Sequence, residues 1–184
     1  NAWDAHREVG KHDVPIAVTL PTEEAPTLAI RDFGPGLSND DVFLVFTQYG
    51  ASTKRGHNGA VGMLGIGSKS GFAYSDSFTI TSWNGGKKRI YAAVLDESDK
   101  GTINLLHEED CDESTGVLIE IAVRRNDLNE FRTKATQLFQ YFSPRPIINI
   151  DLPPEPSEKL ALQNGIIYDA GKARYLNDNA QWIA

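Results

Sequence analysis

The sequence predicts an α+β sandwich in which helices cover a mostly antiparallel sheet. Three observations predict it: the strand-like segments come in runs, short turns join several of them, and 184 residues are enough to bury one core. A parallel sheet built from βαβ units would instead need a helix after each strand. We therefore expect residues 1–151 to form one domain and residues 152–184 to form a linker and the start of a following segment.

The first part of the chain carries signals for two helices and two strands. The expected elements are a helix, two antiparallel strands and a short helix, over residues 1–9, 15–20, 27–32 and 40–48. Gly10 is placed to end the first helix. Ser38 and Asp41 resemble a capping box in which aspartate replaces the usual glutamate. Residues 49–62 are polar, glycine-rich and poorly periodic, so we expect a mobile loop there.

The second part is expected to be richer in strands. The expected elements are a helix, four strands and a second helix, over residues 67–74, 77–83, 87–95, 102–107, 117–123 and 127–141. The turn Asn84-Gly85-Gly86 makes the first two strands a hairpin. The last helix has an apolar stripe at Leu128, Phe131, Ala135, Leu138 and Phe142. After the Pro-Pro-x-Pro stretch, two short strand candidates lie around Ile166 and Tyr175.

Charge and composition exclude several classes of function. A formal net charge of -7 provides no general basic surface, which disfavours non-specific binding to nucleic acid or to anionic lipid. The longest apolar runs are far shorter than the roughly 20 residues that span a bilayer, so we expect this part of the chain to be soluble. The single cysteine, Cys111, excludes an internal disulfide and a cysteine-based metal site, which suits a reducing cytoplasm.

The segment around Asp32 has the residues needed to recognise a flat base. A strand-like run ends at Asp32 and is followed by Gly34 and Gly36. A carboxylate there can accept a hydrogen bond from an exocyclic amine, and the glycines allow a ring to approach the main chain. Adenine fits this description. The alternative is an ordinary Asp-x-Gly turn, and the segment alone does not separate the two.

A second segment has the residues needed to bind phosphate. Gly62, Gly65 and Gly67 lie directly ahead of an expected helix. Free amides of such a loop and the helix N-terminus together attract an anion. The alternative is a glycine loop that serves packing only.

Familiar nucleotide motifs are absent. A P-loop needs lysine directly after its last glycine, but Ser68 separates Gly67 from Lys69. The spacing also fails a dinucleotide fingerprint. Asp32-Phe33-Gly34 matches the magnesium motif of protein kinases in three residues, yet the chain has no His-Arg-Asp loop.

The start of the chain offers oxygen ligands for a metal. Asn1 and Asp4 are three residues apart and share one face of the expected helix. Beside a triphosphate, an amide oxygen can complete the shell of Mg²⁺. The alternative is a solvated helix face.

The order of these segments resembles that of the Bergerat-fold ATPases, the group of gyrase, the Hsp90 chaperones, histidine kinases and MutL. The shared order is Asn-x-x-Asp-Ala, then Asp-x-Gly-x-Gly, then a lid, then Gly-x-x-Gly-x-Gly. The resemblance implies a Bergerat-type two-layer sandwich, whose mixed and mostly antiparallel sheet is covered on one face by helices. It also implies ATP and Mg²⁺ as the cofactors.

The resemblance implies a role for each matching residue. Asn1 would bind magnesium, Asp4 and Ala5 would line the pocket, and Asp32 would receive the adenine amine. The other implied contacts are with the base, the lid and the phosphates, at Gly34, Gly36, Lys54, Gly62, Gly65, Gly67, Ser68, Lys69 and Thr115. Thr115 would occupy the place of a threonine on a later strand, although the family usually has Gly-Thr and this chain has Ser114-Thr115-Gly116.

Within that group, the chain is most similar to the rapid-lysis A family of large tailed phages. The similarity rests on Arg-Asp-Phe-Gly-Pro-Gly, Gly-Ser-Lys-Ser and Tyr-Ser-Asp-Ser-Phe-Thr-Ile-Thr-Ser, at residues 31–36, 67–70 and 74–82. It implies a phage protein that acts on lysis timing or on competition with resident phages. The implied location is the cytoplasm of the infected host, including the periphery of its inner membrane.

The leading hypothesis is Mg-ATP binding with slow hydrolysis, in which the lid at residues 49–62 closes and changes a partner or self-association surface. Lys54 or Lys69 would steady the γ-phosphate. The family's general base is a glutamate four residues before the magnesium asparagine, so we expect it upstream of Asn1 and take the sequence as an internal fragment. Membrane association would come only through the rest of the chain.

Three alternatives differ in class. The first is a nucleotide-sensing interaction module without catalysis, which the acidic surface allows. The second is a DNA-handling ATPase of the gyrase or MutL type, which fits the motifs but not the charge. A histidine-kinase domain ranks last, because no phosphoacceptor helix is found.

Overall fold

The computed structural model describes residues 1–47, 67–97 and 101–154, and four short strands at 157–162, 165–169, 173–177 and 182–183. Side chains are described within residues 1–46, 70–97 and 101–154. The helical elements are α1 (Ala2–Glu8), α2 (Asn39–Thr47), the 3-10 helices η1 (Gly67–Ala73) and η2 (Arg125–Asp127), and α3 (Leu128–Phe139). The strands of the main sheet are β1 (Ala17–Thr19), β2 (Thr27–Arg31), β3 (Ser77–Asn84), β4 (Lys87–Leu95), β5 (Gly101–Asp110), β6 (Gly116–Ala122) and β7 (Ile147–Ile148).

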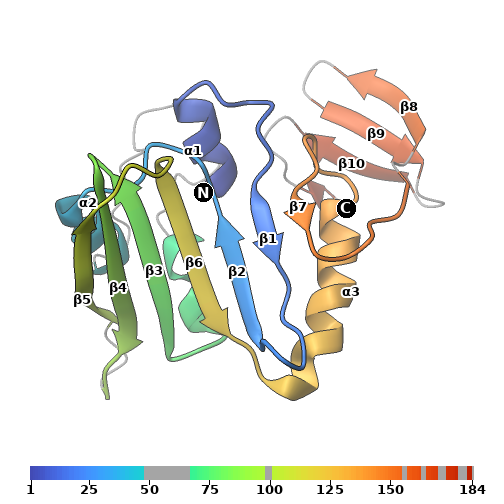
Figure 1. Ribbon diagram of the computed structural model, residues 1–184. Helices are drawn as coiled ribbons and strands as arrows, with labels where there is room; N and C mark the ends of the chain where they lie inside the picture. The colour runs from blue at the N-terminus through green and yellow to red at the C-terminus, as the bar shows by residue number, and fades with distance from the viewer. Residues whose placement is uncertain are drawn as a thin grey trace.

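The main sheet has seven strands in the order β5-β4-β3-β6-β2-β1-β7 (Figure 1). Every neighbouring pair is antiparallel except β1 and β7, which run parallel at one edge. The sheet is therefore mixed and mostly antiparallel, as the sequence predicts. Strand β6 lies between β3 and β2, so the end of β2 adjoins the start of β6 and, beyond it, the end of β3.

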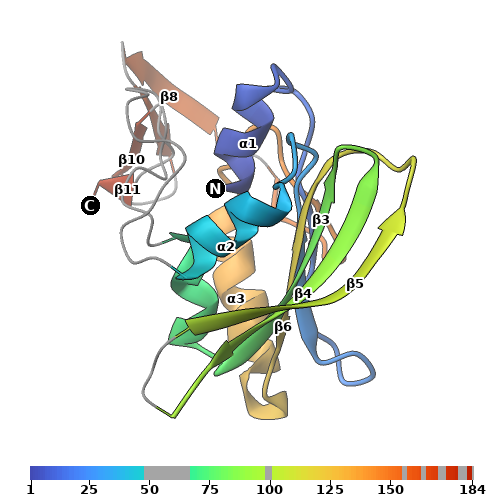
Figure 2. The ribbon, with the colours of Figure 1, turned by 90° about the vertical axis from the view of Figure 1, so that its left-hand side faces the viewer.

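Helices cover one face of this sheet. Figure 2 shows α1, α2, α3 and the green helix η1 on the same side of the main strands. The α+β class and the layer of helices agree with the prediction from sequence, because the strands that follow one another are joined by turns and need no intervening helix.

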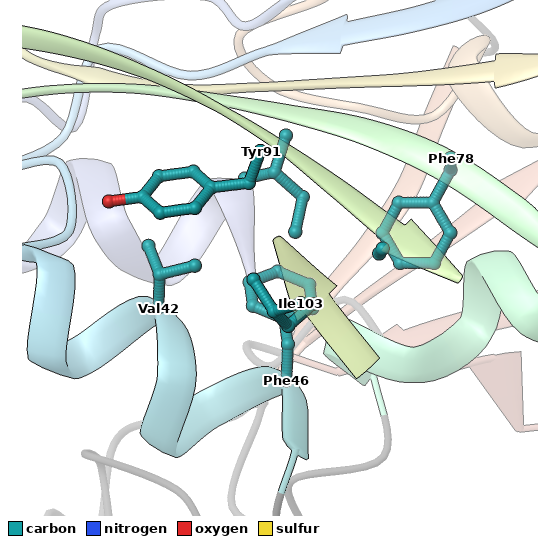
Figure 3. Close-up of a cluster of buried hydrophobic side chains, with 7 residues drawn as sticks. Val42, Phe46, Phe78, Tyr91 and Ile103 are labelled. Carbon is teal, nitrogen blue, oxygen red and sulfur yellow. The ribbon is translucent and has the colours of Figure 1, made fainter. Parts of the chain in front are cut away.

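The larger part of the core lies between α2 and the strands β3, β4 and β5. Val42 and Phe46, one turn apart on α2, pack against the aromatic rings of Phe78 and Tyr91 and against Ile103 (Figure 3). Each such side chain stabilises the fold by about 1.5–3 kcal/mol when it is fully buried. The Tyr91 hydroxyl is satisfied by the side chain of Asn39 at 3.1 Å, so its ring can be buried without an unpaired polar atom.

A second cluster lies between α3 and the first strand. Ala135 and Phe139 of α3 pack against Ile16, Val18 and Leu20. The apolar stripe predicted for this helix is therefore wrong at one position, because Phe139 is buried while Leu138 is 40% exposed. Both positions fit helical spacing from Ala135, and only the direction of the partner strand decides between them.

Local signals predicted several boundaries correctly. The Ser38 hydroxyl donates to Asp41 Oδ2 at 2.6 Å, and the Asp41 amide donates back to Ser38 Oγ at 3.2 Å, so the capping box opens α2 as predicted. The β3–β4 hairpin turns on two residues, Gly85 and Gly86, both with positive φ. Asn84 is already paired with Lys87, so it belongs to the strand rather than to the turn.

Other elements differ from the prediction. The expected helix after Gly67 is a 3-10 helix, β5 extends to Asp110 rather than to residue 107, and β7 was not expected. β7 has two residues and gains its order from pairing with β1, which no local pattern reveals.

The last part of the chain forms a separate four-stranded sheet in the order β11-β10-β9-β8. Its strands are β8 (Ser157–Leu162), β9 (Gly165–Asp169), β10 (Ala173–Asn177) and β11 (Trp182–Ile183). Strands β9 and β10 lie where two short strands are predicted, and β8 and β11 are additional. The expected division of the chain at residues 151 and 152 stays a prediction.

No helix among the described residues combines the length and the apolar character needed to cross a membrane.

Candidate functional site

The β2–α2 loop, residues 32–38, carries the predicted base-recognition segment. Asp32 continues the pairing of β2 with β6, because its amide donates to the Val117 carbonyl at 2.9 Å. Its carboxylate Oδ1 accepts from the amide of Val117 at 3.2 Å and from that of Gly34 at 2.9 Å. Two backbone donors therefore fix the orientation of this carboxylate.

Asp32 keeps one carboxylate oxygen for another partner. The side chain is 8% exposed, and among the described residues no hydrogen bond reaches its Oδ2. Burial raises the pKa of the Asp32 carboxyl above its ordinary value, while the amides of Gly34 and Val117 act against that shift. Oδ2 is not among the enclosed side-chain atoms that lack a partner in the described part of the chain, so a donor can reach it while the two amides hold Oδ1.

Helix α1 packs directly on the loop. Gly34 lies so close to Ala5 that a Cβ added to it would be 2.6 Å from the Ala5 Cβ. Two further side chains from this region reach the loop backbone: the Phe33 amide donates to His6 Nε2 at 2.6 Å, and Lys11 Nζ donates to the Phe33 carbonyl at 2.6 Å. The structure therefore brings the predicted Asp4-Ala5 and Asp32-Gly34 segments together.

Strand β6 holds the loop from the other side. The Thr115 hydroxyl donates to the Gly34 carbonyl at 2.6 Å. Thr115 lies in the turn just before β6, not on a strand as the resemblance implied. Gly116 follows with φ +133, and a Cβ there would be 2.1 Å from the Asp32 carbonyl oxygen, so this close approach requires glycine.

The end of β3 supports the second half of the loop. Ser82 Oγ accepts from the Leu37 amide and donates to the Leu37 carbonyl, both at 2.8 Å. Asn84 Nδ2 donates to the Pro35 carbonyl at 3.1 Å. Gly36 has φ +73, and a Cβ there would be 2.1 Å from the Trp83 carbonyl oxygen. Gly36 is therefore required by its neighbours in the fold, whether or not a ligand approaches it.

Arg31 ties the loop to the turn before β6. Its guanidinium lies 4.0 Å from the centre of the Trp83 ring and 5.0 Å from that of Phe33. It donates from Nη1 to the Asp32 carbonyl and from Nη2 to the Ser114 carbonyl, the latter at 2.9 Å. Stacking and hydrogen bonding together use the planar shape of arginine, which lysine lacks.

Asn1, predicted to bind magnesium, is the N-cap of α1, and Asp4, predicted to line the pocket, lies on that helix. Asn1 is exposed at the N-cap, and its side chain does not cap the helix, whereas Asp4 is buried at 5% exposure. An exposed amide oxygen suits Mg²⁺, which takes a few protein oxygens and keeps water and phosphate oxygens in its remaining positions. No three His, Cys, Asp or Glu side chains gather as a metal cluster in the described part of the chain. The role of Asn1 in magnesium binding stays a prediction.

The predicted phosphate segment is only partly described. Gly62, Gly65 and Lys54 lie outside the described residues, as does the loop predicted at residues 49–62. Gly67 begins η1, whose backbone lies on the same face of the sheet as α1 (Figure 2). Ser68 and Lys69 belong to η1, and their side chains lie outside the described part. Their contacts with phosphate stay predictions.

Sequence reasoning missed the residues that hold the loop. His6, Lys11, Ser82 and Asn84 make five hydrogen bonds to its backbone, across 27, 22, 45 and 49 residues of chain. Only Asn84 carried a signal, as a residue of a predicted turn. The others occupy ordinary helix, turn and strand positions, so their partners depend on which segments the fold brings together.

The fold and this site define an α+β sandwich that presents a buried carboxylate at the end of an inner strand, beneath a short helix. No family model matches this chain, and no curated protein matches it either.

Proposed function

We propose that this chain binds Mg-ATP, with the exocyclic amine of adenine donating to Asp32 Oδ2. The observation that carries the proposal is the Asp32 carboxylate itself: two backbone amides hold Oδ1, and no described group bonds to Oδ2. An amine donor there would complete the hydrogen bonding of a buried carboxylate. The same oxygen would repel the O6 carbonyl of guanine, so the site favours adenine.

The neighbouring residues support the proposal. Asn1 and Asp4 belong to the helix that packs on Gly34 through Ala5, so the amide oxygen proposed for magnesium and the carboxylate proposed for adenine are carried by segments in contact. The net charge of -7 disfavours duplex DNA as the partner, because the chain has no general basic surface for a phosphate backbone. Binding of duplex DNA that persists in a salt series would contradict this choice.

The Bergerat type of the sandwich and the rapid-lysis A resemblance belong to the same proposal. The mixed seven-stranded sheet with helices on one face supports the first. In that family the domain would act as an ATP-dependent switch in the control of phage lysis. The resemblance places the general base four residues before the position of Asn1. Slow hydrolysis is tested as release of phosphate from Mg-ATP, with Asp32→Asn as the control.

Calorimetry with Mg-ATP tests the binding step. Asp32→Asn keeps the shape of the side chain and an oxygen for the two amides, but it puts an amide nitrogen, which can only donate, in the place of Oδ2. Loss of one charged hydrogen bond predicts binding weaker by about 1.5–3 kcal/mol. Asp76→Asn is the matched control, because Asp76 is an exposed carboxylate before β3, at the end of that strand opposite to Trp83. Equal affinity of wild type and Asp32→Asn would remove Asp32 from the site.

A further inference from the structure

The peptide group of Phe33 is held at both ends by side chains from the α1 region. Its amide donates to His6 Nε2 at 2.6 Å, and its carbonyl accepts from Lys11 Nζ at 2.6 Å. Phe33 separates Asp32 from Gly34, whose amide returns to Asp32 Oδ1 at 2.9 Å. These two hydrogen bonds therefore hold Phe33, the one residue between the Asp32 carboxylate and the Gly34 amide that orients this carboxylate.

The hydrogen bonds of His6 assign the position of its ring proton. A backbone amide can only donate, so Nε2 accepts from Phe33 and carries no proton. The other nitrogen, Nδ1, donates to the Val14 carbonyl at 2.8 Å. The side chain is 1% exposed, and burial of a polar ring is costly unless both nitrogens are bonded. Here both are, so the ring is a rigid bridge between the segment after α1 and the β2–α2 loop.

We propose that His6 and Lys11 are positioning residues of the nucleotide site, which set the direction of the Asp32 carboxylate through the Phe33 peptide. This inference rests on the proposed function. If Phe33 moved, Gly34 would move with it, and the amide that orients Oδ1 would no longer face the carboxylate. Positioning of this kind strengthens binding, because the site does not have to order its acceptor when the ligand arrives.

The hydrogen bonds to Phe33 also link the two protein segments that are proposed to contact the two ends of the ligand. His6 lies on the helix that carries Asn1 and Asp4, while Phe33 lies on the loop that carries Asp32. The direct contact between Ala5 and Gly34 joins the same two segments. The helix proposed to hold the metal and the loop proposed to hold the base are therefore joined directly. A shift of α1 would move the loop and change the proposed contact with adenine.

Two substitutions of His6 separate positioning from packing. In His6→Gln the side-chain oxygen reaches the place of Nε2 and still accepts from Phe33. In His6→Asn the amide nitrogen reaches the place of Nδ1 and still donates to Val14, but no acceptor faces Phe33. We expect His6→Asn to bind Mg-ATP about tenfold more weakly than wild type, and His6→Gln to retain most of the affinity. Lys11→Met, which keeps the apolar stem, should weaken binding in the same direction.

A double-mutant cycle with Asp32→Asn identifies the route of the effect. If His6 acts through the Asp32 carboxylate, His6→Asn weakens binding less in the Asp32→Asn background than in wild type. The proposal is overturned if the losses of binding free energy in His6→Asn and Asp32→Asn are additive. It is also overturned if both His6 variants lose affinity in proportion to their loss of unfolding free energy, which would leave His6 a packing residue.

Hydrogen exchange of the Phe33 amide gives a readout without ligand. Exchange should be faster in His6→Asn and near the wild-type rate in His6→Gln. Unchanged exchange in His6→Asn would show that His6 does not hold the loop. If wild-type protein binds no adenine nucleotide, the proposed function fails, and the exchange measurement alone then decides whether His6 orders this loop.

Discussion

Gly34 lies directly against Ala5, and the contact leaves no room for a side chain on the loop. A Cβ at Gly34 would be 2.6 Å from the Ala5 Cβ and 2.9 Å from both the carbonyl carbon and the carbonyl oxygen of Ala5. Real Cβ atoms do not approach others so closely, so a larger residue would push α1 away from the loop. The contact connects the two sequence segments that we propose as parts of one nucleotide site.

Gly34→Ala should therefore destabilise the protein and weaken Mg-ATP binding together. Overpacking of this kind costs about 1–3 kcal/mol. Urea unfolding and calorimetry measure the two effects, and the double variant with Ala5→Gly should recover part of the loss, because only the backbone contacts of residue 5 then remain. Gly85→Asn is the control: a Cβ there meets nothing within 4 Å, and asparagine tolerates its positive φ. Wild-type stability of Gly34→Ala would contradict the packing of α1 on the loop.

Asp32 should make the stability of the fold depend on pH. Burial raises the pKa of its carboxyl above the ordinary value of 3.8, so the folded state holds the proton more tightly than the unfolded chain. The stabilisation from protonated Asp32 is full below the unfolded pKa and is lost as the pH rises through the folded pKa.

Urea unfolding at a series of pH values checks the sign of this dependence. The free energy of unfolding of wild type minus that of Asp32→Asn should fall as the pH rises above 3.8, because the variant does not titrate at this position. A difference that grows with pH would mean that the hydrogen bonds from Gly34 and Val117, rather than burial, dominate the carboxylate.

Ser82 should contribute to stability far more than a small hydroxyl suggests. It is fully buried, and its oxygen bonds to both the amide and the carbonyl of Leu37. Ser82→Ala leaves two backbone groups without their partner, which predicts a loss of about 2–3 kcal/mol in the free energy of unfolding. Ser77→Ala, an exposed position on the same strand, should change it little. Equal effects of the two substitutions would contradict the role of Ser82.

The Asn149 side chain should stabilise the edge of the sheet, because it bonds to the backbone of Leu20 just after β1. Its Oδ1 accepts from the Leu20 amide at 2.7 Å, and its Nδ2 donates to the Leu20 carbonyl at 3.0 Å. Asn149→Asp keeps the shape but replaces the donor with an oxygen that faces the carbonyl, so we expect a loss of about 1–3 kcal/mol on urea unfolding. A loss below about 0.5 kcal/mol would place Asn149 among ordinary surface positions.

Much of the secondary structure was predictable because its causes are local. The capping pair Ser38 and Asp41 lies within one helical turn, and the hairpin at Gly85 depends on adjacent residues with positive φ. The apolar stripe of α3 predicted the helix correctly, but it wrongly predicted that Leu138 is buried. A stripe does not indicate which strand the helix will face. β7 was missed for a related reason: two residues form a strand only if a partner is present.

The candidate site was predictable as a set of residue types but not as a set of contacts. Asp32 and its glycines stand out in the sequence, because a carboxylate beside glycines at a strand end is chemically distinctive. His6 and Ser82 do not stand out, since they bond to backbone groups 27 and 45 residues away. Even the role of Gly36 changes: the sequence suggests space for a base, and the structure shows that the Trp83 carbonyl requires it.

The sequence by itself determined the α+β class, most helices and strands, the capping of α2 and the β3–β4 hairpin. Spacing, turn residues and charge act over a few neighbouring positions, so they can be read without a fold. Only the tertiary structure decided that β6 lies between β3 and β2, that α1 rests on Gly34, and that His6 and Lys11 hold Phe33. These contacts join distant segments, and their partners are chosen by how the layers pack rather than by the residues beside them.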